Sequence, residues 1–104
     1  MSTIIYEDKL IRIQNIITEI EKELKISNRK TIKELKSEII KLFNLNYDLN
    51  NQDLRMQKPG YSSPTIITQE MENYTLFKLH IVNDTTIFFG QQQNNGGSKI
   101  ISIN

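Results

Sequence analysis

The sequence predicts an α+β domain, on three observations. Residues 31–43 have the apolar spacing of an amphipathic helix, and residues 84–89 have the composition of a strand. Between them, turn-forming residues separate shorter β-branched stretches. A chain of 104 residues can build one modest hydrophobic core, so we expect a single domain.

The helix is the element that the sequence defines best. Thr31 and Glu34 form a capping box, in which each side chain bonds a backbone amide that the first helical turn leaves unpaired. Apolar residues then recur every three or four positions and so share one face, namely Ile32, Leu35, Ile39 and Leu42. This pattern predicts an amphipathic helix over residues 31–43.

The second half of the chain contains candidate strands bounded by turns. Residues 84–89 are β-branched and aromatic, and the turn-prone pair Asn83-Asp84 begins this stretch. Residues 53–57 and 65–68 are two further candidates, and the turn-forming residues Pro59, Gly60 and Pro64 lie between them.

The first thirty residues fit two different structures. One apolar series has heptad spacing and would form a helix, paired with residues 31–43 in an oligomerisation domain: Leu10, Ile13, Ile17, Ile20 and Leu24. Alternation at Ile11 and Ile13, and in another phase at Ile20, Leu24 and Ile26, instead fits two half-buried strands. Periodicity alone leaves both interpretations open.

Charge and composition narrow the class of protein. Thirteen Lys and Arg against twelve Asp and Glu are interspersed, which argues against a nucleic-acid face. The basic residues at 28–30, with Lys33 and Lys36 nearby, are predicted to form a solvated edge of the helix. No apolar run approaches the ~20 residues that span a bilayer, and cysteine is absent. We therefore expect a cytoplasmic protein, with the nucleus as the alternative and no membrane partner.

Catalytic chemistry finds no support in the sequence. His80 is the only histidine, and no cysteine or paired carboxylate nearby completes a triad or a metal set. We expect it on the surface or in a turn. No glycine-rich loop stands between a strand and a helix to bind phosphate. The sequence therefore predicts no enzymatic activity, no catalytic or metal-binding residue and no cofactor.

Residues 75–89, "TLFKLHIVNDTTIFF", resemble the end of the ubiquitin fold. In that family, apolar residues are buried at the positions of Leu76, Leu79 and Ile81, and Ile87 and Phe89 lie on the inward face of the last strand. Residues 31–45 resemble the family's first helix. Residues 54–82 are similar, more specifically, to the ubiquitin-like module of the tubulin-folding cofactors, which has a longer Pro/Gly-containing loop.

The resemblance covers residues 9–90 and implies a β-grasp fold, with a mixed sheet and one main helix across it. Residues 1–8 would be an N-terminal arm, 9–90 the ubiquitin-like domain and 91–104 a Gln/Asn/Gly-rich tail. The N-terminal stretch then becomes a hairpin from Lys9 to Ser27. Ile11 and Ile13 would lie on its buried face, opposed by Leu24 and Ile26.

The resemblance implies a monomeric, non-catalytic module that docks a protein partner through the outer sheet face, in a tubulin-chaperone or proteasome-linked pathway. Ile16, Arg55 and Phe88 stand at the positions of ubiquitin's aliphatic recognition patch. Arg55 places a charge there, so we expect ordinary ubiquitin receptors to be excluded. Phe88 would expose an aromatic ring suited to anchoring an interface, unless the arm or the tail covers it.

The tail contains a glycine pair, Gly96 and Gly97, followed by seven residues. Under the resemblance, an alternative function is a ubiquitin-like modifier precursor that is processed after Gly97. The five residues before the pair are all Gln or Asn, without the apolar and arginine side chains that processing enzymes grip in ubiquitin. We therefore predict a polar spacer at this position.

Overall fold

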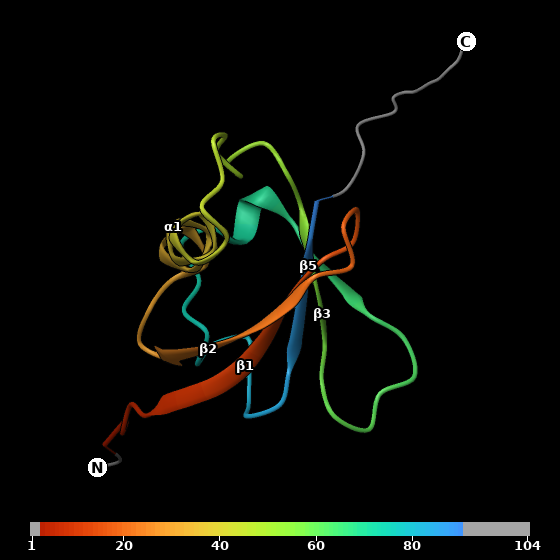
Figure 1. Ribbon diagram of the computed structural model, residues 1–104. Helices are drawn as coiled ribbons and strands as arrows, with labels where there is room; N and C mark the ends of the chain where they lie inside the picture. Colours follow the sequence, from red (N-terminus) through yellow and green to blue (C-terminus); the bar gives the residue numbers. More distant parts are fainter. Residues whose placement is uncertain (1–2, 91–104) are drawn as a thin grey trace, which may run out of the picture.

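The computed structural model describes residues 3–90, in which one helix lies across one face of a five-stranded sheet (Figure 1). The elements in chain order are β1 (Asp8–Asn15), β2 (Glu21–Ser27), α1 (Ile32–Phe43), β3 (Leu54–Gln57), β4 (Thr65–Ile67), the short 3-10 helix η1 (Gln69–Met71) and β5 (Thr86–Phe89).

The N-terminal stretch is a β-hairpin. β1 pairs with β2 in antiparallel register, with Ile11 opposite Leu24. Ile11 and Ile13 are both fully buried on the same face of β1, as alternation along a strand requires. The helical alternative is therefore wrong. Three members of the heptad series are instead mostly exposed, at 44% for Leu10, 54% for Ile17 and 51% for Ile20.

Strand order confirms the predicted β-grasp. The sheet runs β2-β1-β5-β3-β4, with β1 and β5 parallel at its centre and the other neighbours antiparallel. A parallel central pair requires a long crossover, and the segment that contains α1 supplies it. One expected contact differs, because Ile26 lies opposite Lys9 and not opposite an isoleucine of β1.

The helix begins as the sequence predicts. Thr31 is its N-cap, and both hydrogen bonds of the capping box with Glu34 are present. Ile32, Leu35 and Ile39 are fully buried against the sheet, whereas Leu42 is partly buried. The helix ends at Asn44, whose left-handed backbone (φ 53°) allows its N–H to bond the carbonyls of the last turn.

The closing strands also have the predicted phase. Leu54 and Met56 of β3, and Ile87 and Phe89 of β5, point into the core. Of the three apolar positions before β5, Leu76 and Ile81 are buried and Leu79 is half-buried. β5 starts at Thr86, two residues later than the predicted stretch, because Asp84 takes a left-handed turn (φ 68°).

The prediction of a solvated basic edge is wrong at two positions. Lys36 is only 4% exposed, and its Nζ donates to the backbone carbonyl of Gln52 at 2.9 Å. Burial lowers the pKa of Lys36, although Glu72 and Asp53 partly oppose that shift. Asn28 is 5% exposed. The long loop after α1 covers the lysine, and contacts of that range leave no trace in local sequence spacing.

Within residues 3–90, no helix has the length and apolar composition to cross a membrane.

Candidate interaction face

The face of the sheet opposite α1, which we call the outer face, is the candidate site. Alternation along the strands decides which side chains point to it. In β3, Leu54 and Met56 are buried, so Arg55 points outward and is exposed, as predicted. The residues on this face include Arg12 and Gln14 of β1, Glu23 of β2, Arg55 and Gln57 of β3, Ile66 of β4, and Thr86 and Phe88 of β5.

Strand order places Phe88 on the middle strand of the sheet, near one end of this face. Phe88 lies directly opposite Gln14 on one side and directly opposite Arg55 on the other. Arg55 in turn lies opposite Ile66, which is 46% exposed on the edge strand. An aromatic ring, a guanidinium group and an aliphatic side chain therefore form one row across three strands. The sequence analysis missed Ile66, although alternation in "TII" before the buried Ile67 would have shown it.

Phe88 is half-buried, so its ring is less exposed than the sequence led us to expect. The described part of the N-terminal arm, residues 3–7, does not cover it. Tyr6 instead packs edge-on against Phe77, with ring centroids 5.8 Å apart. The arm precedes β1, whereas Phe88 pairs near the far end of that strand. Cover from the tail falls outside the described residues.

Ile16 lies beside the end of β5. Its N–H donates to the carbonyl of Phe89 at 2.9 Å, which continues the β1–β5 ladder by one step. The side chain is 40% exposed. It is a diagonal neighbour of Phe88, within the range at which side chains of adjacent strands meet. The structure thus brings all three predicted residues, Ile16, Arg55 and Phe88, to one end of the outer face.

The exit of the chain from β5 is tightly fixed. Gly90 is buried with φ 94°, and a Cβ there would lie 2.8 Å from Oδ1 of Asn15. That oxygen accepts hydrogen bonds from the amides of Ile17 and Thr18, which closes the β1–β2 turn. The chain therefore leaves the sheet beside this turn. Gly96 and Gly97, the predicted processing site, lie outside the described residues.

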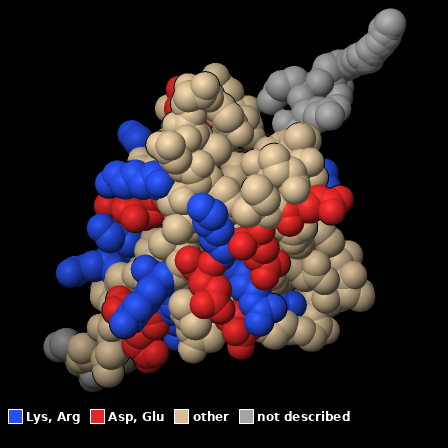
Figure 2. Space-filling model, in the orientation of Figure 1, with Lys and Arg blue, Asp and Glu red and all other residues tan. Residues whose placement is uncertain are grey.

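Charges of both signs are mixed around this site. In Figure 2, Lys and Arg side chains alternate with Asp and Glu over β1 and β2, and neither sign forms a broad area on that view. On the outer face, Arg12 lies directly opposite Glu23. Such mixing favours recognition by shape and single charged contacts over a long-range field.

The described residues do not bring a set of metal ligands together. Within residues 3–90, no group of three His, Cys, Asp or Glu side chains is placed to hold a metal ion. His80 is exposed in a turn with φ 56°, as the sequence predicts for a turn histidine. The outer face itself presents an aromatic ring, aliphatic groups, amides and guanidinium groups, which suit binding better than bond-making chemistry.

Solved structures with the same fold are ubiquitin-like domains, while no family model and no curated protein matches the chain. The C-terminal ubiquitin-like domain of mouse tubulin-specific chaperone e has a TM-score of 0.70 at 11% identity, covering 92% of this chain and 98% of that one. A ubiquitin-like domain of an Arabidopsis thaliana protein has a TM-score of 0.57 at 10% identity, covering 86% and 85%. Ubiquitin of Caldiarchaeum subterraneum has a TM-score of 0.52 at 14% identity, covering 88% and 100%. The chain therefore has the ubiquitin-like β-grasp fold.

Proposed function

We propose that this ubiquitin-like domain is a non-catalytic interaction module that docks a protein partner through its outer face. The observation that carries the proposal is the row of Phe88, Arg55 and Ile66 across adjacent strands, with Ile16 beside it. Interface hot spots favour aromatic and arginine side chains at the centre of a patch.

The fold supports a pathway only by analogy. The likeness to a domain of a tubulin-specific chaperone supports a tubulin-chaperone pathway in the cytoplasm as the setting. A proteasome-linked pathway is the alternative that the family resemblance implies. Arg55 supports a partner different from ordinary ubiquitin receptors, because it places an exposed charge at a position where ubiquitin's recognition patch is aliphatic.

Affinity capture from the source cells, with three versions of the whole chain as bait, tests the proposal. Wild type should retain a defined partner, and Phe88→Ala should lose it. Tyr47→Ala is the matched control, because it also removes an aromatic ring, 44% exposed, from a loop after α1 and away from the outer face.

Retention of the same partners by Phe88→Ala and by wild type would contradict the docking face. Equal loss with Tyr47→Ala would contradict it too, since binding would then depend on exposed aromatic residues in general. Far-UV circular dichroism of each bait shows whether it is folded.

A further inference from the structure

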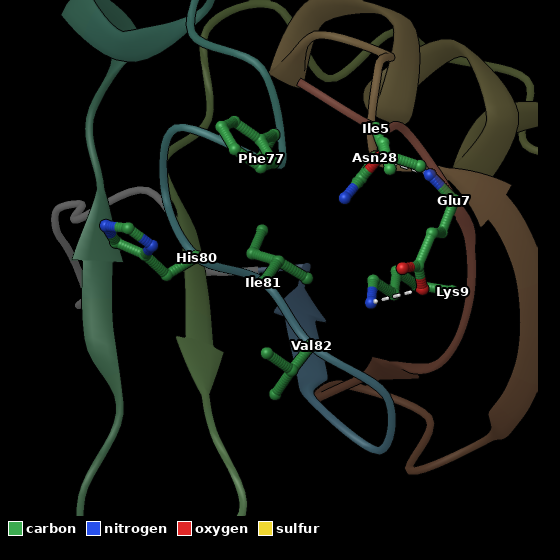
Figure 3. Close-up of a pocket in the computed structure, with 8 residues that line it drawn as sticks. All are labelled: Ile5, Glu7, Lys9, Asn28, Phe77, His80, Ile81 and Val82. Atoms are coloured by element: carbon green, nitrogen blue, oxygen red, sulfur yellow. Dashed lines mark hydrogen bonds and ion pairs between the residues drawn. The ribbon is translucent and has the colours of Figure 1, made fainter. Parts of the chain in front are cut away.

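A pocket of about 200 Å³ lies between the N-terminal arm and the segment before β5 (Figure 3). We call it the arm cleft. It lies at the start of β1, whereas Phe88 pairs near the end of that strand. Its apolar walls are Ile5 from the arm and Phe77, Ile81 and Val82 from the facing segment. Glu7, Lys9 and Asn28 supply its polar groups, and the side chain of His80 points away from its centre.

Asn28 joins the elements around the cleft. Its backbone N–H donates to the carbonyl of Glu7 at 2.8 Å, and its carbonyl accepts from the amide of Phe77 at 2.9 Å. Its side-chain Oδ1 accepts from the amide of Glu7 at 2.9 Å. Because a backbone N–H can only donate, this contact fixes which end of the side-chain amide is oxygen and which is nitrogen.

The nitrogen end of Asn28 is therefore directed into the cleft (Figure 3). Asn28 is 5% exposed, and its Nδ2 makes no hydrogen bond with residues 3–90. Solvent in the cleft reaches this nitrogen, so an acceptor oxygen that enters the cleft would replace water there. The cleft thus offers two N–H groups to an acceptor oxygen that enters it.

Cavity size limits what that oxygen belongs to. Pockets for cofactor-sized or drug-sized ligands measure about 300–1,000 Å³. A cleft of about 200 Å³ is smaller and open to one side, so it fits a single apolar side chain and the peptide group that carries it. A peptide carbonyl next to an aliphatic side chain satisfies the Asn28 donor and the apolar walls together.

Charge around the mouth selects the flanking residues of such a peptide. Glu7 is the one acidic residue that lines the cleft, and Lys9 neutralises it at 3.3 Å. Arg29 lies over the ring of Tyr6, 5.4 Å from its centroid, and Tyr6 packs on Phe77. Lys78, the residue after Phe77, instead lies over the ring of Tyr74, 4.1 Å from its centroid. Because Lys9 neutralises Glu7, the guanidinium group of Arg29 next to Tyr6 leaves a positive charge near the mouth, which complements carboxylates on the peptide.

We propose that the arm cleft binds an acidic, extended segment of a protein partner, which inserts one leucine-like side chain between Ile5 and Val82 and accepts a hydrogen bond from Nδ2 of Asn28. This site is separate from the outer face. It therefore adds a second recognition element to the module and does not depend on the role of Phe88.

Titration of the full chain, labelled with ¹⁵N, with the peptide acetyl-Asp-Asp-Leu-Asp-Asp-amide tests the proposal. We expect saturable shifts of the side-chain NH₂ signals of Asn28 and of the backbone amides of Phe77 and Val82. Binding through one side chain and a few charges implies a Kd on the order of 1 mM. The same peptide with serine in place of leucine should bind at least about tenfold more weakly, because it lacks the apolar anchor.

Three variants locate the site. Asn28→Asp keeps the acceptor for the Glu7 amide but replaces the Nδ2 donor by an oxygen, so affinity should fall by about tenfold or more. Val82→Ser, at a wall residue that is 44% exposed, should also weaken binding and leaves Asn28 intact if the aspartate variant fails to fold. Ile66→Ser is the matched control, 46% exposed on the distant edge strand, and should leave the affinity unchanged.

Four results would overturn the proposal. The first is that no signals around the cleft shift at about 5 mM peptide, well above the expected Kd. The second is that the serine peptide binds as tightly as the leucine peptide, and the third is that Ile66→Ser weakens binding as much as Val82→Ser. The fourth is that the shifts centre on Phe88 and Arg55. The last result would place the peptide on the outer face. Conversely, Phe88→Ala should not change the affinity for this peptide, so the two proposals fail separately.

Discussion

Replacing Lys36 by alanine tests a buried polar contact that the sequence does not predict. The side chain is 4% exposed and donates to the carbonyl of Gln52 at 2.9 Å. The change removes three buried methylene groups at about 0.8 kcal/mol each. It also removes a hydrogen bond from a charged donor, which contributes about 1.5–3 kcal/mol. Relief of the desolvated ammonium group, whose lowered pKa reports its burial, offsets part of this loss. We expect the free energy of unfolding to fall by about 2–3 kcal/mol.

Urea unfolding at pH 7, followed by far-UV circular dichroism, measures this loss. Lys33→Ala is the matched control, because Lys33 is exposed on the same helix and gains the same helix propensity from alanine. The control should stay within about 0.5 kcal/mol of wild type. A loss for Lys36→Ala no larger than that of the control would refute the reasoning, since the ammonium group would then lie in water.

The pH dependence of unfolding gives the same contact a second test. Burial has the largest effect on the pKa of Lys36 and lowers it below 10.5 in the folded chain. Between that lowered pKa and 10.5, the unfolded chain binds more protons than the folded chain, so this group makes stability rise with pH. Wild type should therefore gain stability relative to Lys36→Met as the pH rises toward 10.5. Lys33→Met, at an exposed position of the same helix, is the control measured over the same range.

Three further substitutions test the outer face and the end of β5, and one mass measurement tests the tail. Phe88→Ala should lower the thermal midpoint by less than about 8 °C, because the ring is half-buried and its loss costs about 1 kcal/mol; a larger drop would make it a core residue. Arg55→Ile should gain affinity for domains that bind ubiquitin's aliphatic patch, and equal binding by wild type would refute exclusion by charge. Gly90→Ala should destabilise the domain by more than about 1 kcal/mol, since its φ of 94° and the 2.8 Å approach to Asn15 both oppose a Cβ; unchanged urea unfolding would contradict this. Intact mass of the protein from its own cells should retain the residues after Gly97, and a dominant species ending there would favour the modifier.

The spacing of apolar and capping residues predicts those parts of the fold that depend on contacts between residues close together in the chain. The capping box of Thr31 and Glu34 and the buried series of α1 are local, and both are present. The N-terminal stretch is different, because its many isoleucines fit periods of 3.5 and of 2. Resemblance to a known family separated the two, and full burial of both Ile11 and Ile13 agrees with its choice.

Alternation along the strands also predicts which side chains point to the outer face. It does not predict the exposed fraction of each side chain. Arg55 points outward for the reason given from sequence, since Leu54 and Met56 point inward. The half-burial of Phe88 depends on its neighbours in two other strands, Gln14 and Arg55, which local spacing cannot supply. The arm cleft forms between residues more than seventy positions apart, such as Ile5 and Phe77, so no local sequence motif predicts it.

Three of the buried polar residues lie beside the two surfaces: Asn15, Asn28 and Thr85. The side chain of each accepts a hydrogen bond from a backbone amide of a loop or of the arm. Oγ1 of Thr85 accepts from the amide of Val82 and so places one wall of the arm cleft, whereas Asn28 holds the opposite wall. Asn15 closes the turn that carries Ile16 beside the outer face. Because a buried polar group without its partner is costly, each of these hydrogen bonds selects one loop conformation among many. The apolar core thus specifies the β-grasp, and these few polar contacts specify the surfaces through which we propose that it binds.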